Sequence, residues 1–562
     1  MRIKNIIRHE IEKAAKALKI VVNPIFTIET PKNIEFGDFS SNIALVSAKQ
    51  NKQTPMELAE LINTKFKRNK NFSAVTVAKP GFLNFTISRS LYVEIIEEIL
   101  SAGTEYGKSN YGNETKVLLE FVSANPTGPL NIVSARAAAF GDTIYRVMSY
   151  LGFLPTREFY INDAGNQVEI LAESIELRFR EILGERIGEM PDEAYHGEYI
   201  RELAARLNTV EGSRILHMNE IERLEKIKRF ALDEIHEMQV ESLEKFDVEF
   251  DSWISEKAIR ATGIIEEVLS YLYEAKVTYE KEDAIWFMAT KFDDEKDRVL
   301  LKADGLPTYF VPDIAYHTTK YHREFDVIID VLGPDHHGYI QRLIAALKAL
   351  KYDETKMEFI ILQQVNLFNE GEKIKMSKRL GKIVTMDELI EEVGKDAARF
   401  FFIDRKPASH LNFDLELAKK QSAENPVYYC QYAYARICSV LEKSQSLPFD
   451  TSEIDYSKLK KLNKQDEFQL IKKLQEFEEV LINVADQREP HRLTEYLKEL
   501  SGMFHKYYHD FNILNKRTKD TTLARIYLIM AIKNVLNIAF DLIGVGAPEK
   551  MQKKNEKNTC CL

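Results

Sequence analysis

The chain has 562 residues, of which 45% are hydrophobic and 29% charged, and its formal net charge is −10 at pH 7. This length exceeds what one hydrophobic core supports, so we expect about three or four domains. The acidic balance argues against a general nucleic-acid coat but allows a local basic groove. The four cysteines form no C-x-x-C pair, so we expect no disulfide framework, no metal site and a cytoplasmic location.

The first part of the chain, residues 1–105, predicts a small α+β module. Charged and apolar residues alternate at helical spacing in MRIKNIIRHEIEKAAKALKI, whereas a signal peptide has an unbroken apolar core. A short β segment, VTVAKPGFLNFTIS, lies among further helical segments. We therefore expect no targeting segment and a separate N-terminal domain.

The next part, residues 106–414, alternates strand-like and helix-like segments. LLEFV leads through a turn into SARAAAFGDTIYRVMSYLGF, and DVIIDVLG leads through another turn into IQRLIAALKAL. This repetition predicts a Rossmann-like parallel sheet with ligands at the carboxyl ends of its strands. A charged helical stretch, about residues 166–275, interrupts the pattern, and we favour a solvated helical insertion over a coiled-coil partner surface.

The last part, residues 415–551, is helical throughout and predicts an all-α bundle. Apolar residues recur at helical spacing in LTEYLKELSGMFHKYYHDF. The apolar stretch LIMAIKNVLNIAFDLIGVGA contains Lys533 and Asp541, which a lipid span would tolerate poorly, so we expect a buried bundle helix and no membrane partner. Residues 552–562 predict a frayed tail.

A basic, glycine-flanked loop, GEKIKMSKRLGK, follows an apolar strand. At its centre Lys375, Met376, Ser377 and Lys378 spell KMSK. Two ammonium groups on flexible stems suit the binding of a polyphosphate. A solvated basic loop is the plain alternative, because four residues are few enough to occur by chance.

Six segments in chain order resemble the bacterial arginyl-tRNA synthetases, a class I family. They are EFVSANPTGPL, REFYINDAGNQ, GLPTYFVPDIAYH, GPDHHGY, KMSKRLGKIVTMDEL and ENPVYYCQYAYARI. The resemblance implies a multidomain α/β enzyme that activates L-arginine with ATP and Mg²⁺, without a prosthetic group, and transfers it to the 3′ end of tRNA(Arg). It also implies an N-terminal module at the tRNA elbow and a bundle that reads the anticodon; we expect a monomer.

The resemblance assigns five residues to arginine. Tyr309 and Asp313 would hold its side chain, Glu120 and Asn125 its guanidinium and α-amino ends, and His337 would line the pocket. A buried guanidinium needs carboxylates in planar, bidentate geometry. Glu120 is also a carboxylate inside LLEFV, where a parallel strand should be apolar, and this favours function over an edge-strand charge.

The turn GPLNIVSAR departs from the family, which reads H-x-G-H where this chain has NIVS at residues 131–134. Asn131 and Ser134 keep uncharged donors for phosphate, while the branched β-carbon of Val133 crowds the place of the base. With glycine at position 128 the upstream lysine of some members is absent, so the KMSK lysines must supply the charge. The predicted ATP-binding residues are Gly128, Asn131, Ser134, Gln364, Met376, Ser377 and Lys378, and the predicted catalytic residues are Lys375, Lys378, Asn131 and Ser134.

For tRNA, the resemblance assigns one surface to each outer domain. Phe82 and Asn84 match positions where a ring stacks on a splayed base and an amide reads its edge, although Phe82 as core of a small β unit remains an alternative. In the bundle, Tyr428, Tyr432 and Arg436 provide a stacking surface for single-stranded bases.

The altered turn leaves two alternatives to an active arginine–tRNA ligase. One is a catalytically silent paralogue that binds tRNA or arginine, and the other is a different nucleotidyl transferase of the same fold. The intact Glu120, Asp313 and Lys378 argue against the first. The N-terminal module and the long helical bundle argue against the second.

Replacement of the loop lysine tests how the turn works. Lys378→Ala is expected to slow arginine activation by roughly 10²–10³, the scale for losing one preorganised donor. Asn131→Ala and Ser134→Ala should each cost about tenfold, because a neutral hydrogen bond contributes on the order of 1 kcal/mol. The measurement is tRNA-dependent ATP–pyrophosphate exchange at saturating arginine. Unchanged rates in both Lys378→Ala and Asn131→Ala, with tRNA binding retained, would support the silent paralogue.

Overall fold

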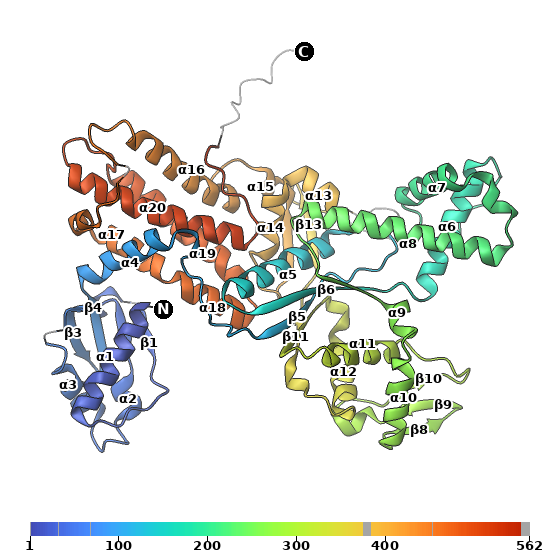
Figure 1. The fold of residues 1–562 in the computed structure, drawn as a ribbon, viewed down its shortest axis with the longest axis horizontal. Helices are drawn as coiled ribbons and strands as arrows, with labels where there is room; N and C mark the ends of the chain where they lie inside the picture. Colours follow the sequence, from blue (N-terminus) through green and yellow to red (C-terminus); the bar gives the residue numbers. More distant parts are fainter. Residues whose placement is uncertain (1, 32, 68, 375–383, 452, 552–562) are drawn as a thin grey trace, which may run out of the picture.

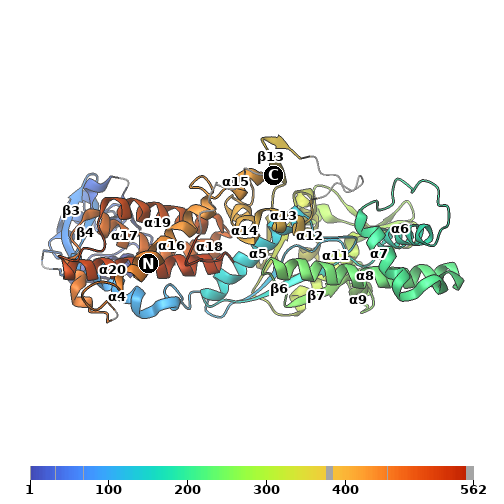
Figure 2. The same ribbon diagram turned by 90° about the horizontal axis from the view of Figure 1, so that it is seen from above.

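The structure is a computed structural model. It describes residues 2–31, 33–67, 69–374, 384–451 and 453–551. The molecule is elongated: the N-terminal module and the C-terminal helices lie toward one end, the central sheet in the middle and a helical insertion at the other end (Figures 1 and 2). This arrangement confirms the predicted multidomain α/β class.

The N-terminal module is a four-stranded antiparallel sheet in the order β1-β2-β4-β3, packed against helices. Its first helix buries Ile3, Ile7 and Ile11, whose spacing of four residues places them on one face. The elements are α1 (Arg2–Leu18), β1 (Ile28–Glu29), β2 (Phe39–Ser41), α2 (Ile43–Ser47), α3 (Pro55–Asn63), β3 (Phe72–Ala78) and β4 (Phe82–Ile87).

Helix α4 (Arg89–Ala102) follows the module but packs on the C-terminal bundle, where the ring of Tyr92 lies 5.4 Å from that of Phe468. The described structure thus groups residues 2–87 as one compact unit. The predicted division at residue 105 stays a prediction.

A five-stranded parallel sheet in the order β12-β11-β5-β6-β7 forms the centre. In the central strand, Val117 and Leu119 belong to one hydrophobic core and Leu118 to the other, so both faces of the sheet are covered. From β5 the chain continues to β6 on one side, and from β11 it continues to β12 on the opposite side. The strand order therefore reverses between β5 and β11, which is a topological switch point. The elements are β5 (Lys116–Glu120), α5 (Ile132–Tyr150), β6 (Leu154–Ile161), β7 (Ser252–Ser255), α11 (Phe310–His322), β11 (Val327–Leu332), α12 (His337–Ala349) and β12 (Met357–Ile361).

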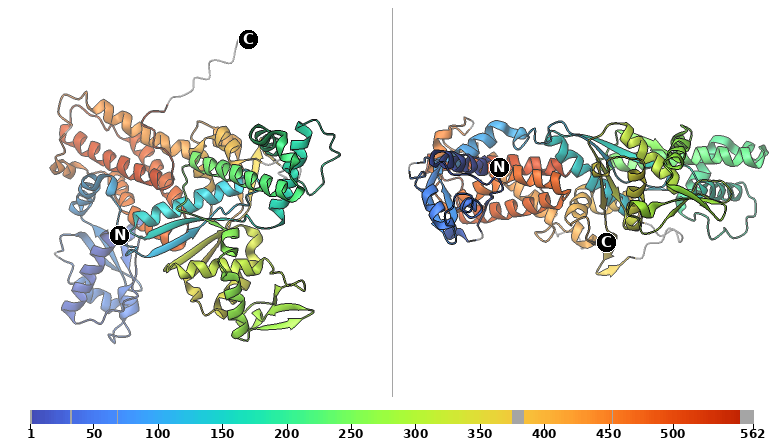
Figure 3. Two further views of the ribbon diagram at one scale, coloured as in Figure 1. Left: turned by 45° about the vertical axis from the view of Figure 1, so that its right-hand side comes forward. Right: turned by 90° about the horizontal axis from the view of Figure 1, so that it is seen from below.

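The helical insertion projects from the sheet with a core of its own, which includes Leu171, Leu203 and Ile235 (Figure 3). It consists of α6 (Asn166–Ile182), α7 (Glu198–Glu211) and α8 (Glu220–Lys245). The rest of the stretch predicted as an insertion, residues 166–275, lies elsewhere: it contains the edge strand β7 as well as α9 (Glu256–Arg260) and α10 (Ile264–Glu274), which pack on α11.

Two small sheets complete the central region. One is antiparallel and lies beyond α10, and the other pairs β13 with β14 and β15 on the side of the bundle. Their strands are β8 (Thr278–Lys281), β9 (Ala284–Phe287), β10 (Arg298–Leu301), β13 (Val365–Asn369), β14 (Glu372–Lys373) and β15 (Leu411–Asp414), and α13 (Met386–Val393) lies between the last two.

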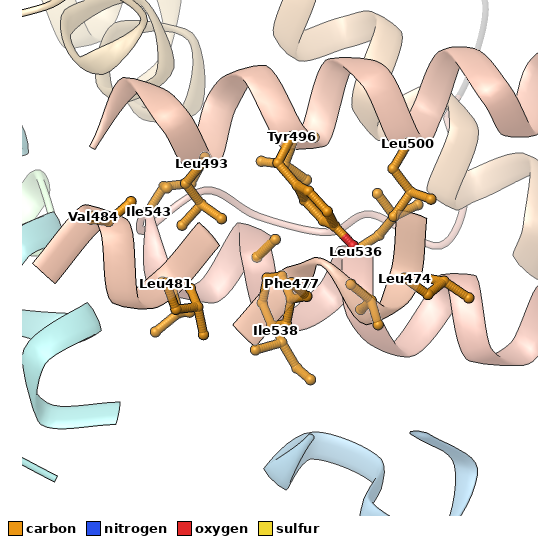
Figure 4. Close-up of a cluster of buried hydrophobic side chains, with 14 of the residues drawn as sticks. Leu474, Phe477, Leu481, Val484, Leu493, Tyr496, Leu500, Leu536, Ile538 and Ile543 are labelled. Atoms are coloured by element: carbon orange, nitrogen blue, oxygen red, sulfur yellow. The ribbon is translucent and has the colours of Figure 1, made fainter. Parts of the chain in front are cut away.

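The C-terminal part is the predicted bundle. Phe477, Tyr496 and Leu536, from three different helices, meet in its core (Figure 4). The last helix is long and apolar enough to cross a membrane by composition, but 72% of its apolar window is buried inside the protein, which is typical of a core helix. The helices are α14 (Lys395–Ile403), α15 (Leu415–Lys419), α16 (Pro426–Ser444), α17 (Gln465–Gln475), α18 (Phe477–Gln487), α19 (His491–Asp510) and α20 (Lys519–Leu542).

A buried arginine joins the central sheet region to the bundle. Arg399 of α14 is fully buried and forms an ion pair with Asp142 of α5. Its Nε and Nη1 donate to the carbonyl oxygens of Ile543 and Phe246, at 2.9 and 2.8 Å. Since each partner belongs to a different segment, one side chain fixes three segments relative to α14.

Replacement of this arginine should weaken the whole central assembly. Arg399→Met leaves the buried Asp142 with one cation fewer, and breaking a buried pair costs about 3–5 kcal/mol. The measurement is the free energy of unfolding in urea. Lys550→Ala, which removes an exposed pair with Glu442, is the control and should change it by less than about 1 kcal/mol. Equal effects of the two substitutions would contradict the role of Arg399.

Candidate active site

The main cavity lies at the carboxyl ends of β5 and β11, at the topological switch point. Its volume is about 580 Å³. Because strand order reverses here, the loops after the two strands separate and leave room for a ligand. Its polar walls come from Glu120, Ser123, Asn125, Tyr160, Asn162, Asp313, Tyr316, His317, Asp330, Asp335, His336, Tyr339 and Arg342.

One wall of this cavity is acidic. Asp313 lies in the first turn of α11, and Tyr339 of α12 donates its hydroxyl to it. Burial raises the pKa of the Asp313 carboxyl, and the nearby carboxylates Glu256 and Glu120 add to the rise. A positive ligand would relieve both penalties, since an opposite charge favours the ionised form.

A buried lysine lies behind this wall and holds two carboxylates. The ammonium of Lys320 contacts Glu120 and lies 2.7 Å from an oxygen of Asp330. Burial opposes its charge, but Asp330 and Glu120 raise the pKa of Lys320 above its usual value. The hydroxyl of Tyr316 lies 2.8 Å from Glu120 and 2.7 Å from Glu158. The network therefore fixes the position of Glu120.

The sequence prediction named Glu120 but missed other members of this network. Glu158 lies in REFYIN and Asp330 in DVIIDVLG, each a buried carboxylate inside an apolar strand. That is the signal that singled out Glu120, and it could have found them. Lys320 and Glu256 offered no such signal, because charged residues at helical positions are ordinarily exposed.

A second cavity, of about 300 Å³, adjoins the first and is lined by the altered turn. It shares Asn125 with the main cavity and adds Asn131, Val133 and Ser134. The exposed side chain of Val133 borders this space, and the crowding of a base by its branched β-carbon stays a prediction.

The side chain of Asn131 already has a structural task. Its Oδ1 accepts from the backbone N–H groups of Val133 and Ser134, at 2.8 and 3.1 Å, and caps α5. The carbonyl oxygen is thus engaged, and the amide N–H groups are what the side chain can offer to a phosphate. Ser134 is buried and lines both this cavity and a smaller one beside it.

The strand before the KMSK loop and the helix after it are described, and the loop is not. Thr385, which caps α13, forms an isolated β-bridge with Asn131. The N–H of Met386 donates to the carbonyl of Leu130 at 2.8 Å. The segment that follows the loop is therefore hydrogen-bonded to the connection between β5 and α5 (residues 121–131), which we call the nucleotide turn. The predicted loop residues, Lys375, Met376, Ser377 and Lys378, lie outside the described residues.

Of the remaining predicted substrate residues, Tyr309, Gln364 and Gly128 are not among those that line the main cavity. Tyr309 is 70% exposed before α11 and does not line the main cavity, and the exposed Gln364 precedes β13. His337 begins α12, but its side chain is not described, whereas the neighbouring His336 lines both cavities. Gly128 has a φ of 156° and borders a smaller cavity beside the turn.

The predicted tRNA residues of the N-terminal module lie on β4. Asn84 is only 4% exposed, and its Oδ1 accepts from the hydroxyl of Ser40 at 2.7 Å. Phe82 is half-buried at the start of the strand. Asn84 thus helps to hold the sheet together, and Phe82 is the more accessible of the pair.

The predicted tRNA residues of the bundle gather on α16. Tyr428 and Tyr432 stack with their rings 6.1 Å apart and 11° from parallel. Arg436 donates to the hydroxyl of Tyr432 at 2.7 Å, and its guanidinium lies 4.8 Å from the centre of the Tyr508 ring. These side chains form one aromatic and cationic surface, to which Tyr508 of α19 was not predicted to belong.

Comparison with known proteins identifies the class to which this fold and site belong. The catalytic-domain family described as "tRNA synthetases class I (R)" matches residues 95–435. The "Arginyl tRNA synthetase N terminal domain" matches residues 1–87, and the "DALR anticodon binding domain" matches residues 430–551. The parallel sheet with its ligand cavity is thus the catalytic domain of a class I aminoacyl-tRNA synthetase.

Individual relatives narrow the class to one family. An arginine–tRNA ligase of Oceanobacillus iheyensis is 43% identical over 552 residues, which cover 98% of each chain. The crystal structure of a Campylobacter jejuni protein assigned as an arginyl-tRNA synthetase is 35% identical, with a TM-score of 0.76, over 83% of this chain and all of that one. The Thermus thermophilus arginyl-tRNA synthetase, at 20% identity and a TM-score of 0.75 over 98% of this chain and 100% of that one, shares the fold. The chain belongs to the arginyl-tRNA synthetase family.

The raised pKa of Asp313 predicts a pH dependence of arginine binding. If Asp313 binds arginine as predicted, the carboxylate form is required, so the affinity for arginine should be full above this pKa and fall as the pH decreases through it. The proton that arginine displaces is measured by calorimetry in buffers of different ionisation enthalpy.

Asp313→Asn should abolish the proton release and raise the arginine KM about tenfold or more, because a charged hydrogen bond contributes on the order of 1.5–3 kcal/mol. The exposed Asp304 provides the control variant Asp304→Asn. An unchanged KM in Asp313→Asn would remove this residue from the arginine site.

Proposed function

We propose that the acidic cavity binds L-arginine through Asp313 and Glu120. Both carboxylates line the same cavity, and the family to which the chain belongs ligates arginine to tRNA. A guanidinium presents planar pairs of donors, and carboxylates accept them two at a time. The surplus of carboxylates over cations in this wall is the observation that carries the assignment.

The α-amino and α-carboxyl ends of arginine would then lie toward the nucleotide turn. Asn125 lines both cavities and is placed to accept or donate to these ends. In the first step an α-carboxylate oxygen attacks the α-phosphorus of ATP, and the bond to the β-phosphate breaks with release of pyrophosphate. The two adjoining cavities allow the two substrates to meet there.

ATP would bind as its Mg²⁺ complex in the cavity lined by Asn131 and Ser134. These residues donate neutral hydrogen bonds to phosphate oxygens, and the two KMSK lysines, Lys375 and Lys378, carry the positive charge. Because Oδ1 of Asn131 caps α5, its amide N–H groups are the donors toward ATP. Gly128 and Gln364 complete the proposed nucleotide site.

In the second step a ribose hydroxyl at the 3′ end of tRNA(Arg) attacks the arginyl carbonyl carbon, loses its proton and displaces AMP. Phe82 at the N-terminal module, together with Tyr428, Tyr432 and Arg436 on the bundle, would bind more distant parts of the tRNA. Stacked rings and a guanidinium suit unpaired bases. We propose that the enzyme acts as a cytoplasmic monomer. No described feature favours the silent paralogue.

ATP–pyrophosphate exchange tests the activity directly. With arginine, ATP, Mg²⁺ and tRNA(Arg) the protein should catalyse exchange, and without tRNA the exchange should be nearly silent. Activity should also fall steeply as salt increases, because phosphate contacts release counterions. Lysine in place of arginine is the control and should give no exchange. Robust exchange without tRNA would contradict the tRNA requirement, and no exchange under any condition would contradict the proposed function.

A further inference from the structure

Helix α8 of the outlying insertion contacts the nucleotide turn directly. Gln239 is 2% exposed, and its side-chain amide donates to the carbonyl oxygens of Gly128 and Asn125, at 2.9 and 3.3 Å. Both acceptors belong to the turn between β5 and α5. The position of this turn therefore depends on a helix that belongs to a different structural unit.

The same face of α8 also contacts α13, the helix whose capping residue Thr385 forms the β-bridge with Asn131. Ser242 donates its hydroxyl to Asp387, and the ammonium of Lys245 lies 2.8 Å from the same carboxylate. Asp387 lies in the first turn of α13, next to Thr385. Positions 239, 242 and 245 follow one another at intervals of three residues, so they share one face of the helix.

A second helix of the insertion reaches the turn as well. The hydroxyl of Tyr199, in α7, donates to the carbonyl of Thr127 at 2.8 Å. A β-carbon added at Gly128 would lie 2.9 Å from the Tyr199 ring, so the backbone and the ring are in close contact. The turn is thus held from the insertion by two side chains on two helices.

We infer that Gln239, Asp387 and Tyr199 are positioning residues for ATP, and that α8 fixes the nucleotide turn relative to α13. This inference rests on the proposed function and names a new task for the insertion within it. In this chain the turn offers phosphate neutral donors, so binding depends on where those donors lie. A preorganised donor is effective only while its geometry is fixed.

The test compares three variants with the full-length protein. Gln239→Met keeps the length of the side chain and removes both donated hydrogen bonds. Asp387→Ala releases α8 from α13, and Tyr199→Phe removes one hydroxyl while keeping the ring. We expect the ATP KM to rise roughly tenfold in Gln239→Met and about threefold to tenfold in Tyr199→Phe, at the scale of one or two neutral hydrogen bonds. A rise of about threefold to tenfold is also expected in Asp387→Ala, which removes an ion pair with the partly exposed Lys245.

A purely structural role of these residues would also change the arginine KM and the unfolding temperature, whereas a positioning role would not. In Tyr199→Phe and Asp387→Ala, which leave the hydrogen bond from Gln239 to Asn125 intact, the arginine KM should stay within about twofold of the wild-type value. The unfolding temperature should stay within a few degrees in all three variants, since few contacts are lost. Arg206→Ala is the matched control, because it removes an exposed ion pair between α7 and α8, with Glu234, away from the turn. It should change neither KM.

Two outcomes would overturn the inference: an unchanged ATP KM in Gln239→Met and Tyr199→Phe, or parallel rises of the ATP and arginine KM values in Tyr199→Phe and Asp387→Ala. Should Gln239→Met fail to fold, Tyr199→Phe decides alone, because it removes a single oxygen atom. Equilibrium binding of ATP by calorimetry, without arginine, separates this inference from the proposed function. Wild-type protein that binds ATP more tightly than the variants but lacks exchange would support the inference and contradict the proposed function.

Discussion

Electrostatic balance at the carboxyl ends of β5, β6 and β11 is the constraint on which the site depends. Glu120, Glu158 and Asp330 stand in three neighbouring strands and are buried there. Burial of a charge is costly unless it is paired. Lys320 pairs with Glu120 and Asp330, and Arg323 pairs with Glu158. Among the described residues, a tyrosine hydroxyl is the hydrogen-bond partner of the Asp313 carboxyl, and no ion pair holds it, so a cationic ligand would supply the missing counter-charge.

On the proposed nucleotide side, fixed geometry would compensate for donors that carry no charge. The turn at residues 131–134 has no charged group, and its asparagine also caps α5. The bridge between Asn131 and Thr385, together with the hydrogen bonds from Gln239, holds the turn from two sides. An uncharged phosphate site depends more on neighbouring residues that fix its geometry than a charged site does.

The sequence was sufficient for the architecture, because apolar strands followed by amphipathic helices leave a periodic signal. It was not sufficient for β7, whose four residues lie inside a charged helical stretch and are too few to show a period. Glu120 and Asp313 were predicted, and the structure places both in one cavity, whereas Tyr309 is exposed beside it. The sharing of Tyr316 between Glu120 and Glu158 depends on strand order, which the sequence does not specify.

The most direct test of this account is the affinity of the protein for L-arginine compared with L-citrulline, measured by calorimetry. Citrulline has nearly the same shape, but a neutral urea replaces the guanidinium. If the acidic wall exists to neutralise a cation, citrulline should bind at least about thirtyfold more weakly, since loss of one partner of a buried charge pair costs about 2 kcal/mol or more. Equal affinity for the two ligands would contradict the account.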